Sequence, residues 1–203
     1  MLMRVFSQQP CAHEGCINRA LFGRDTCYLH MEDKEGLTEE IRGMLERETV
    51  LRGMELSGLT LEDLDLSGKE FWFCNLSHCR MSRINITGAK FRLTYFDFSN
   101  FSECRWSEID ASLTVLSGSQ LVGCEFSASD MTRCNFVGIR GQEILFDDMG
   151  LYDSRFTNSI LNSTRFRNCN VKRVDFSKSR FQQVTFGTTN VEEAVFDEVE
   201  GQE

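Results

Sequence analysis

Residues 71–96 read FWFCNLSHCRMSRINITGAKFRLTYF, and a large apolar side chain recurs in this stretch at every fifth position. The same register continues on both sides, from Leu51 to Phe196, and among its thirty positions only Ala111 and Gly141 lack a large side chain. A helix repeats its faces about every 3.6 residues and a strand about every 2, so neither produces a period of five. A short, fixed repeat predicts a solenoid, in which stacked coils bury one continuous core.

A second position of the repeat is also selective. Two residues before each large position, the side chain is mostly small or β-branched, which predicts that it points inward beside the large one. Ser or Thr often follows the large residue, with Gly next, and these residues are typical of turns. Each unit is therefore predicted to form one short straight side and one corner. Six cysteines occupy the small inward position and are predicted to be buried: Cys74, Cys79, Cys104, Cys124, Cys134 and Cys169.

Three units illustrate the pattern: residues 74–78 read CNLSH, residues 89–93 read AKFRL and residues 174–178 read VDFSK. They resemble the A-[DN]-[LF]-x-x unit of the pentapeptide repeat proteins, and the resemblance covers roughly residues 51–200. It implies an all-β solenoid, namely a right-handed, four-sided parallel β-helix with four units in each coil. Thirty units would give about 7.5 coils and a rod about 36 Å long, at ~4.8 Å per coil. The fold by itself does not imply one function.

Three further cysteines lie before the repeat, in a Cys-x4-Cys-x10-Cys-x2-His pattern formed by Cys11, Cys16, Cys27 and His30. Three thiolates and one imidazole are the ligand set of a closed, tetrahedral structural zinc site. A segment of thirty residues has no core of its own, and metal binding can supply its folding energy. We therefore expect a structural Zn²⁺ here, with His13 as an alternative ligand. Free or disulfide-linked thiols in an unfolded tail are the other interpretation.

The sequence divides into three parts: a zinc-binding module over residues 1–32, a capping or linker helix over 33–50, and the β-helix over 51–203. Thr38, followed by two glutamates, resembles a capped helix start. Apolar residues then fall on one side of the helix, at Leu37, Ile41, Met44 and Leu45. Because a solenoid end exposes its core and an open strand edge, we expect this helix and the module to cover the first coil. Docking elsewhere, or dimerisation through the helix, is the alternative.

An apolar patch is predicted on the outside of the rod. Positions twenty residues apart stack on successive coils, and this stepping aligns outward residues that a soluble rod would normally make polar. A contiguous apolar surface usually marks a contact, which here is the folded-back helix, a second copy of the chain, or another protein. The predicted interaction patch consists of Trp72, Phe73, Leu93, Tyr95, Leu113 and Val115.

The chain carries a net charge of −9, which disfavours direct nucleic-acid binding. Some pentapeptide repeat proteins imitate DNA and occupy type II topoisomerases such as gyrase, and this role needs acidic residues lined up along one face. The predicted outer stripes instead mix charges, as in Asp63, Arg83 and Glu103. A topoisomerase modulator is therefore the second interpretation, after a scaffold that presents a rigid surface to a protein partner.

An enzyme is not expected, because the sequence holds no nucleophile elbow, P-loop or dinucleotide-binding motif. Residues 1–10 lack the apolar stretch of a signal peptide, and no run of apolar residues is long enough to span a membrane. Cysteines used as core residues are typical of a reducing compartment, so we expect a cytoplasmic protein. At the two interrupted positions, Ala111 and Gly141, we expect neighbouring bulk to fill the core, with a local bulge or ligand notch as the alternative.

Overall fold

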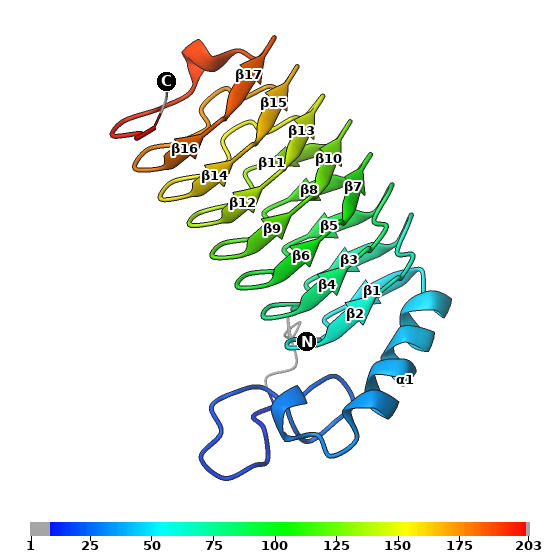
Figure 1. Cartoon of the computed structure of the whole chain (residues 1–203). Coiled ribbons are helices and arrows are strands. Elements are labelled where there is room, and N and C mark those ends of the chain that lie inside the picture. Colours follow the sequence, from blue (N-terminus) through cyan, green and yellow to red (C-terminus); the bar gives the residue numbers. More distant parts are fainter. Residues whose placement is uncertain (1–8, 202–203) are drawn as a thin grey trace, which may run out of the picture.

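The five-residue units wind into a parallel β-solenoid of about seven turns in the computed structural model, which describes residues 9–201 (Figure 1). Every strand pairs in parallel with the residues twenty positions away, as in Leu51 with Phe71 and Phe71 with Phe91. The predicted fold is confirmed. The first eight residues of the predicted module and the last two of the chain lie outside the described residues.

Three sides of the rod are sheets of three-residue strands. The first contains β1 (Val50–Arg52), β3 (Glu70–Trp72), β5 (Lys90–Arg92), β8 (Asp110–Ser112) and β11 (Asp130–Thr132). The second contains β7 (Arg105–Ser107), β10 (Glu125–Ser127), β13 (Leu145–Asp147), β15 (Arg165–Arg167) and β17 (Thr185–Gly187). The third contains β2 (Thr60–Glu62), β4 (Arg80–Ser82), β6 (Asn100–Ser102), β9 (Gln120–Val122), β12 (Arg140–Gln142), β14 (Ile160–Asn162) and β16 (Arg180–Gln182). The fourth side is a ladder of single bridges that joins Glu55, Asn75, Tyr95, Val115, Asn135, Arg155, Asp175 and Val195.

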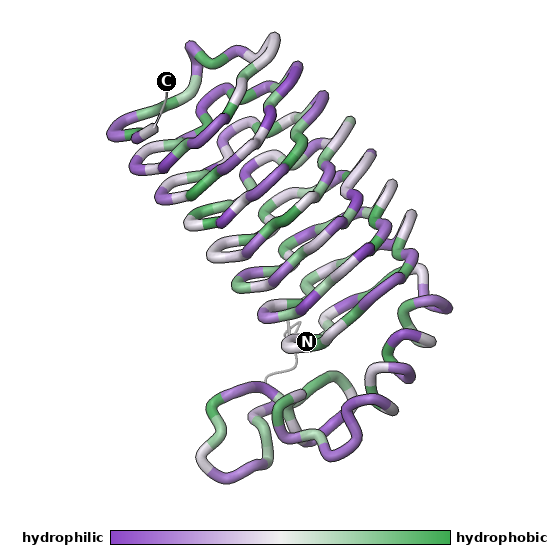
Figure 2. The backbone as a smooth tube through the Cα atoms, viewed as in Figure 1, coloured by the Kyte–Doolittle hydropathy of each residue, from purple (hydrophilic) through white to green (hydrophobic). Residues whose placement is uncertain are grey.

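The corners of the coils explain why the unit has five residues. Twenty-two non-glycine residues have positive φ values, between 47° and 60°, and all lie at outward corner positions of the rod. This left-handed backbone turns the chain by a quarter between one short side and the next. Glycine takes the same conformation at several corners, as at Gly118 and Gly138. Figure 2 shows hydrophilic and hydrophobic residues mixed along each coil, because every side has both inward and outward positions.

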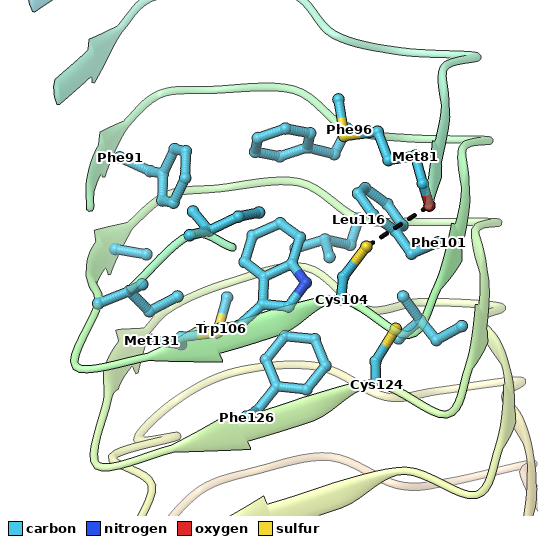
Figure 3. Packing of buried hydrophobic residues seen from close by; sticks show 14 of the residues in the cluster. Met81, Phe91, Phe96, Phe101, Cys104, Trp106, Leu116, Cys124, Phe126 and Met131 are labelled. Carbon is cyan, nitrogen blue, oxygen red and sulfur yellow. Dashed lines mark hydrogen bonds between the residues drawn. The ribbon is translucent and has the colours of Figure 1, made fainter. Parts of the chain in front are cut away.

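The interior is filled by the two predicted inward positions. Large residues such as Phe91, Trp106 and Phe126 are fully buried, and the small residues between them, including all six cysteines of the rod, are buried as well (Figure 3). Aromatic rings stack along the axis, with centroids 5.4 Å apart for Trp106 and Phe126. Inward hydroxyls other than that of Thr114 donate hydrogen bonds to backbone carbonyls, as Ser119 Oγ does to the Phe96 oxygen of the preceding coil at 2.9 Å. This satisfies polar groups that would otherwise destabilise a dry core.

Neither interrupted position breaks the ladder. Gly141 pairs in register with Leu121 and Leu161, and Ala111 pairs with Phe91 and Met131, so the alternative of a local bulge is wrong. A Cβ added to Gly141 would lie only 2.9 Å from Leu161 Cδ2, which shows that neighbouring side chains fill the space. The coil that holds Ala111 also holds Trp106, the largest side chain of the core.

One helix, α1 (Lys34–Arg47), lies beside the first coils of the rod (Figure 1). Its buried residues Leu37, Ile41 and Leu45 belong to the same apolar cluster as the solenoid core, with Met44 packed against it. The predicted start at Thr38 is wrong, since the N-cap is Asp33, whose carboxylate accepts a hydrogen bond from the Gly36 N–H at 2.8 Å. Short 3-10 turns occur at η1 (Tyr28–His30) and η2 (Val191–Glu193).

Polar contacts tie α1 to the rod at its C-terminal end and near its middle. Lys69 Nζ donates to the backbone oxygens of Glu46 and Glu48, at 3.2 and 2.9 Å. Arg42 donates to the backbone oxygen of Glu62 at 2.6 Å. The helix therefore covers the open first coil, and it does not extend over the predicted interaction patch, where Leu93 and Leu113 stay 36% and 50% exposed.

Candidate metal centre and interaction groove

The four predicted metal ligands converge on one point. One ligand atom from each of Cys11, Cys16, Cys27 and His30 lies within 4.8 Å of all the others. The Sγ atoms of Cys16 and Cys27 are 3.8 Å apart, and His30 Nδ1 lies 3.5 Å from the sulfurs of both Cys11 and Cys27. A tetrahedral zinc with Zn–S bonds of ~2.3 Å and a Zn–N bond of ~2.0–2.1 Å would give edges of about 3.8 and about 3.5 Å. Three of the six separations between ligand atoms therefore match those of a zinc site, and the four residues could hold a metal ion.

Local structure of the N-terminal segment brings these ligands together. Cys11 follows a bridge between Pro10 and Arg19, and Cys16 comes directly after Gly15, whose φ of 74° forms a tight turn. The other two ligands lie on the η1 turn. Cys27 is its N-cap and His30 is its last residue. Two turns and one bridge thus bring together four ligands that are separated in the sequence.

Hydrogen bonds make one thiol of the cluster acidic. Burial opposes ionisation of Cys11, but the backbone N–H of Cys27, 3.3 Å from its sulfur, and the His30 ring act in the other direction. Together they lower the pKa of Cys11 to about 6. For Cys16 the backbone N–H of Asn18 lowers the pKa, but burial and the neighbouring thiols raise it overall. A low thiol pKa favours metal binding, because the thiolate is the form that coordinates.

His13 is placed beside the cluster rather than in it. Its ring stacks on the ring of His30 with centroids 3.8 Å apart, and its Nδ1 lies 3.1 Å from the backbone oxygen of Glu14. The described residues offer four ligand atoms at mutual contact distance, and His13 supplies none of them.

Four residues of the predicted patch line a groove of about 480 Å³ on the bridge side of the rod: Leu93, Tyr95, Leu113 and Val115. Trp72 and Phe73 do not line it. The guanidinium of Arg52 lies over the Trp72 ring, 4.8 Å from its centroid, and Trp72 Nε1 donates to Glu70 at 3.1 Å. From here on, this feature is called the groove.

The second half of the groove is charged and was missed by the sequence analysis. It is lined by Arg133, Asp153, Arg155, Arg173 and Asp175. Asp153 accepts ion pairs from Arg133 at 3.5 Å and from Arg173 at 3.2 Å. The signal was present, since the step of twenty that aligned Leu113 and Val115 leads on to these same residues.

A second exposed aromatic group lies on a different corner. Phe98 is 57% exposed, and its ring stacks on that of His78 with centroids 5.4 Å apart. The same step of twenty would also have found this pair, together with Gly118, over which the Phe98 ring lies. Phe98 resembles Leu113 in having a positive φ and an exposed apolar side chain, so it is a useful control position.

Comparison with protein families gives one match. The model of pentapeptide repeats matches eight copies, over residues 55–92, 94–133, 112–140 and 151–187. No curated protein sequence matches the chain. Within the described residues, no helix is long and apolar enough to cross a membrane.

Solved structures similar to this chain share little sequence with it. QnrB1, described as a plasmid-mediated fluoroquinolone resistance protein, is 14% identical, with a TM-score of 0.42 over 75% of this chain and 89% of that chain. HetL, a pentapeptide repeat protein involved in heterocyst differentiation regulation in the cyanobacterium Nostoc, is 13% identical, with a TM-score of 0.29 over 82% and 95%. Rfr23 from the cyanobacterium Cyanothece is 16% identical, with a TM-score of 0.23 over 80% and 99%.

Proposed function

Because this chain belongs to the pentapeptide repeat family, whose fold is a solid rod filled by its own side chains, we propose that it is a non-catalytic scaffold protein. Its rigid surface binds another protein through the groove. The observation that carries this proposal is the pair Leu93 and Leu113, which stay 36% and 50% exposed at the same corner of adjacent coils and line the groove. Complete burial of a fully exposed leucine is worth about 1.5–3 kcal/mol, so covering the exposed third to half of these two side chains favours association by a corresponding part of that free energy.

Rigidity supports the same proposal. Each coil is held to the next by backbone hydrogen bonds on all four sides, as between Val115 N and the Thr94 oxygen at 3.0 Å. Leu93 and Leu113 also sit at corners with φ values of 50° and 55°, where the backbone fixes the direction of the side chain. A surface that is ordered before binding loses little entropy on association, which favours recognition of a partner.

A structural zinc ion is part of the proposal. Cys11, Cys16, Cys27 and His30 would hold it, and the match between their spacing and a zinc tetrahedron supports this metal. The ion would order the module through residue 32, while α1 (Lys34–Arg47), within the predicted helix over 33–50, caps the rod that begins with β1. Contacts from Leu21, which joins the solenoid core, and from Phe22 N–H to the Glu55 oxygen at 2.8 Å would carry this order to the first coil.

A cytoplasmic location fits the proposed scaffold. All nine cysteines are free thiols, including the buried pair Cys104 and Cys124 on adjacent coils. Thiols persist in reducing compartments, and zinc sites of this ligand type are typical there.

Binding to a type II topoisomerase is not adopted as the function. A DNA mimic needs unpaired acidic groups in a continuous row, whereas several carboxylates of the rod are neutralised by neighbours. Asp63 pairs with Arg83 at 2.6 Å, Glu70 with Lys90 at 3.0 Å, and Asp147 with Arg165 at 2.6 Å. A supercoiling assay with purified gyrase tests this directly, and inhibition or protection at micromolar protein would reinstate the topoisomerase role.

The scaffold proposal is tested with a double variant, Leu93→Asn/Leu113→Asn. Asn accepts the left-handed backbone of these corners, so the rod is expected to fold normally while the groove becomes polar. Phe98→Asn is the matched control, because it removes an exposed apolar corner side chain from a different edge.

Quantitative cross-linking in cells of the source organism then compares the three proteins. We expect partners that are retained by wild type and by Phe98→Asn but lost by the double variant. If sedimentation shows a dimer that only the double variant dissociates, the partner is a second copy of this chain. Identical cross-linked partners and identical mass for all three proteins would contradict the proposal.

A further inference from the structure

We propose that the groove binds an amphipathic α-helix that lies along the axis of the rod, with an apolar half over Leu93 and Leu113 and an acidic half over Arg133 and Arg155. The inference rests on the proposed function, which it extends by naming the chemistry and shape of the bound segment. It follows from three observations: the two halves of the groove, the net positive charge of its charged half, and the distance between coils.

The groove runs along the axis of the rod, because it is bordered by two columns of outward residues, each with one residue per coil. One column lies at a corner (the corner stripe) and the other on the ladder of single bridges (the bridge stripe). The corner stripe continues from Leu113 to Arg133 and Asp153, and the bridge stripe continues from Val115 through Asn135 to Arg155. Apolar and charged side chains are therefore separated along the axis of the rod, not across it. A partner that uses both halves must extend over at least four coils.

The charged half has an excess of arginine. Three arginines face two aspartates there, in a chain whose net charge is −9. Arg133 and Arg173 share one carboxylate, that of Asp153. Arg155 is exposed and makes no ion pair with any of residues 9–201. A bound carboxylate would thus complete a charge arrangement that the chain leaves open, whereas a basic segment would be repelled.

The remaining aspartate of the groove makes no ion pair with Arg155 among the described residues. Asp175 follows Arg155 on the bridge stripe, but its Oδ1 accepts the Ser177 N–H at 2.9 Å, as part of the corner turn. This local bond holds the carboxylate to its own coil. The binding site for an acidic side chain of the partner is therefore formed by Arg133 and Arg155. Arg133 lies on the same coil as Asn135, and Arg155 pairs with Asn135 from the next coil.

The spacing of the coils favours a helix over an extended segment. Successive side chains of one stripe are ~4.8 Å apart, the separation of neighbouring strands. A helix repeats its faces every ~5.4 Å, so over three coil spacings it drifts by only about 2 Å. An extended chain repeats every ~6.8 Å and would drift by about 6 Å over the same distance. A helix can thus place one side chain per turn against each coil.

The register of the two halves defines a sequence pattern. From Val115 to Arg155 is two coil spacings, about 10 Å, or six to seven residues of helix at ~1.5 Å per residue. The bound helix should therefore carry apolar residues at i and i+3 or i+4, followed by Asp or Glu about two turns later on the same face. Recognition of such anchors is the usual mode for helices in grooves.

Selection from a library of random peptides, about sixteen residues long (roughly four helical turns) and displayed on phage, tests the inference against the full-length protein. Peptides that also bind Leu93→Asn/Leu113→Asn are removed. We expect the enriched sequences to show the apolar–acidic helical pattern and, as synthetic peptides, to gain helical circular dichroism on binding. Affinity should fall at least about tenfold with Arg155→Glu and return when the peptide's acidic residue is changed to Lys.

Arg140→Glu is the matched control. Arg140 lies on the seven-stranded side, is exposed, and makes no ion pair within the described part of the chain, so the same charge change should leave affinity unaltered. Groove-dependent peptides with a period of two, or without an acidic preference, would overturn the helix inference and leave the scaffold function standing. If no enriched peptide depends on Leu93 and Leu113, the inference is wrong, and the cross-linking comparison decides the proposed function separately.

Discussion

The imidazole rings of His13 and His30 lie face to face, with their centroids 3.8 Å apart and their planes 5° from parallel. His30 Nδ1 is the atom at contact distance from the cluster sulfurs. His13 packs on the face of this ligand ring. We expect His13→Ala to keep one zinc per chain, with affinity reduced by less than about tenfold, because it removes only a neighbour of a ligand.

His30→Ala should instead lose tight binding, since it removes one of four ligands. Cobalt substitution separates the two variants, because the absorption spectrum of tetrahedral cobalt changes when a ligand is lost and persists when the geometry is intact. A wild-type spectrum for His30→Ala, combined with a lost spectrum for His13→Ala, would assign the fourth ligand to His13.

Removal of zinc should open the module but leave the rod folded. The core of the solenoid continues through all coils without the module, and Lys69 holds the end of α1 independently of the metal. After chelation we expect trypsin to cut at Arg19 and Arg24, while the β-sheet circular dichroism is unchanged. The unfolding temperature should fall by only a few degrees, at about 2–4 °C for each kcal/mol of lost end packing.

Cys16→Ser should reproduce the protease sensitivity without chelator, which separates loss of the metal from side effects of the reagent. Cooperative unfolding of the whole chain on chelation would show that the metal stabilises the rod itself.

The nine thiols should fall into two classes of reactivity. Burial raises the pKa of Cys79 and of Cys134 to about 12, because the thiolate would be desolvated in the core, whereas a hydrogen bond with Cys124 lowers the pKa of Cys104. All six rod thiols are buried, so they should resist a thiol reagent at neutral pH. In the metal-free native protein we expect Cys11, Cys16 and Cys27 to react, and zinc to protect them. Mass spectrometry of the labelled protein identifies the sites, and rapid labelling of the rod thiols would show that the coils open.

Two buried threonines at equivalent positions should respond oppositely to replacement by valine. Thr94 Oγ1 donates to the Phe71 oxygen at 3.1 Å, whereas the buried Thr114 Oγ1 has no hydrogen-bond partner among the described residues. Thr94→Val should destabilise the protein by about 0.5–1.5 kcal/mol, and Thr114→Val should be neutral or stabilise it by about 1 kcal/mol. Urea unfolding measures both, and equal destabilisation would mean that the Thr114 hydroxyl is satisfied in solution.

Gly141→Ala should be destabilising for a steric reason alone. The glycine lies in strand β12, and the new methyl group would meet Leu161 Cδ2 at 2.9 Å, so we expect a loss of about 1–3 kcal/mol. Adding Leu161→Val should recover part of it. Gly187→Ala in β17 is the control, because its nearest contact would be an ordinary 3.8 Å to Arg167. Equal stability of the two single variants would show that the core can yield at Gly141.

The coil architecture could be predicted from the sequence because one period specifies both the inward positions and the corners. The start of α1 could not, since Asp33 and Thr38 both suit an N-cap, and only packing of Leu37 into the core makes residues before Thr38 helical. The clustering of Cys11, Cys16, Cys27 and His30 could be predicted from residue type and spacing, but the stacking of His13 on His30 depends on turns whose geometry the spacing leaves undetermined.

The groove was predicted only in part, for a different reason. Apolar residues on an outer stripe are conspicuous, so Leu93 and Leu113 were found. Charged residues on the same stripe look like ordinary surface, and their importance depends on which carboxylate each arginine reaches. That Arg155 lacks an ion-pair partner among the described residues is visible only once the side chains are placed.

The pairing of each residue with the one twenty positions away governs how such a rod can change length. Gain or loss of twenty residues would add or remove one storey and leave every column on the outside aligned. Gain or loss of five would rotate everything beyond it by a quarter turn and divide the groove between two walls. Lengthening this molecule without destroying its surface is therefore restricted to whole storeys, although its interior would accept any multiple of five.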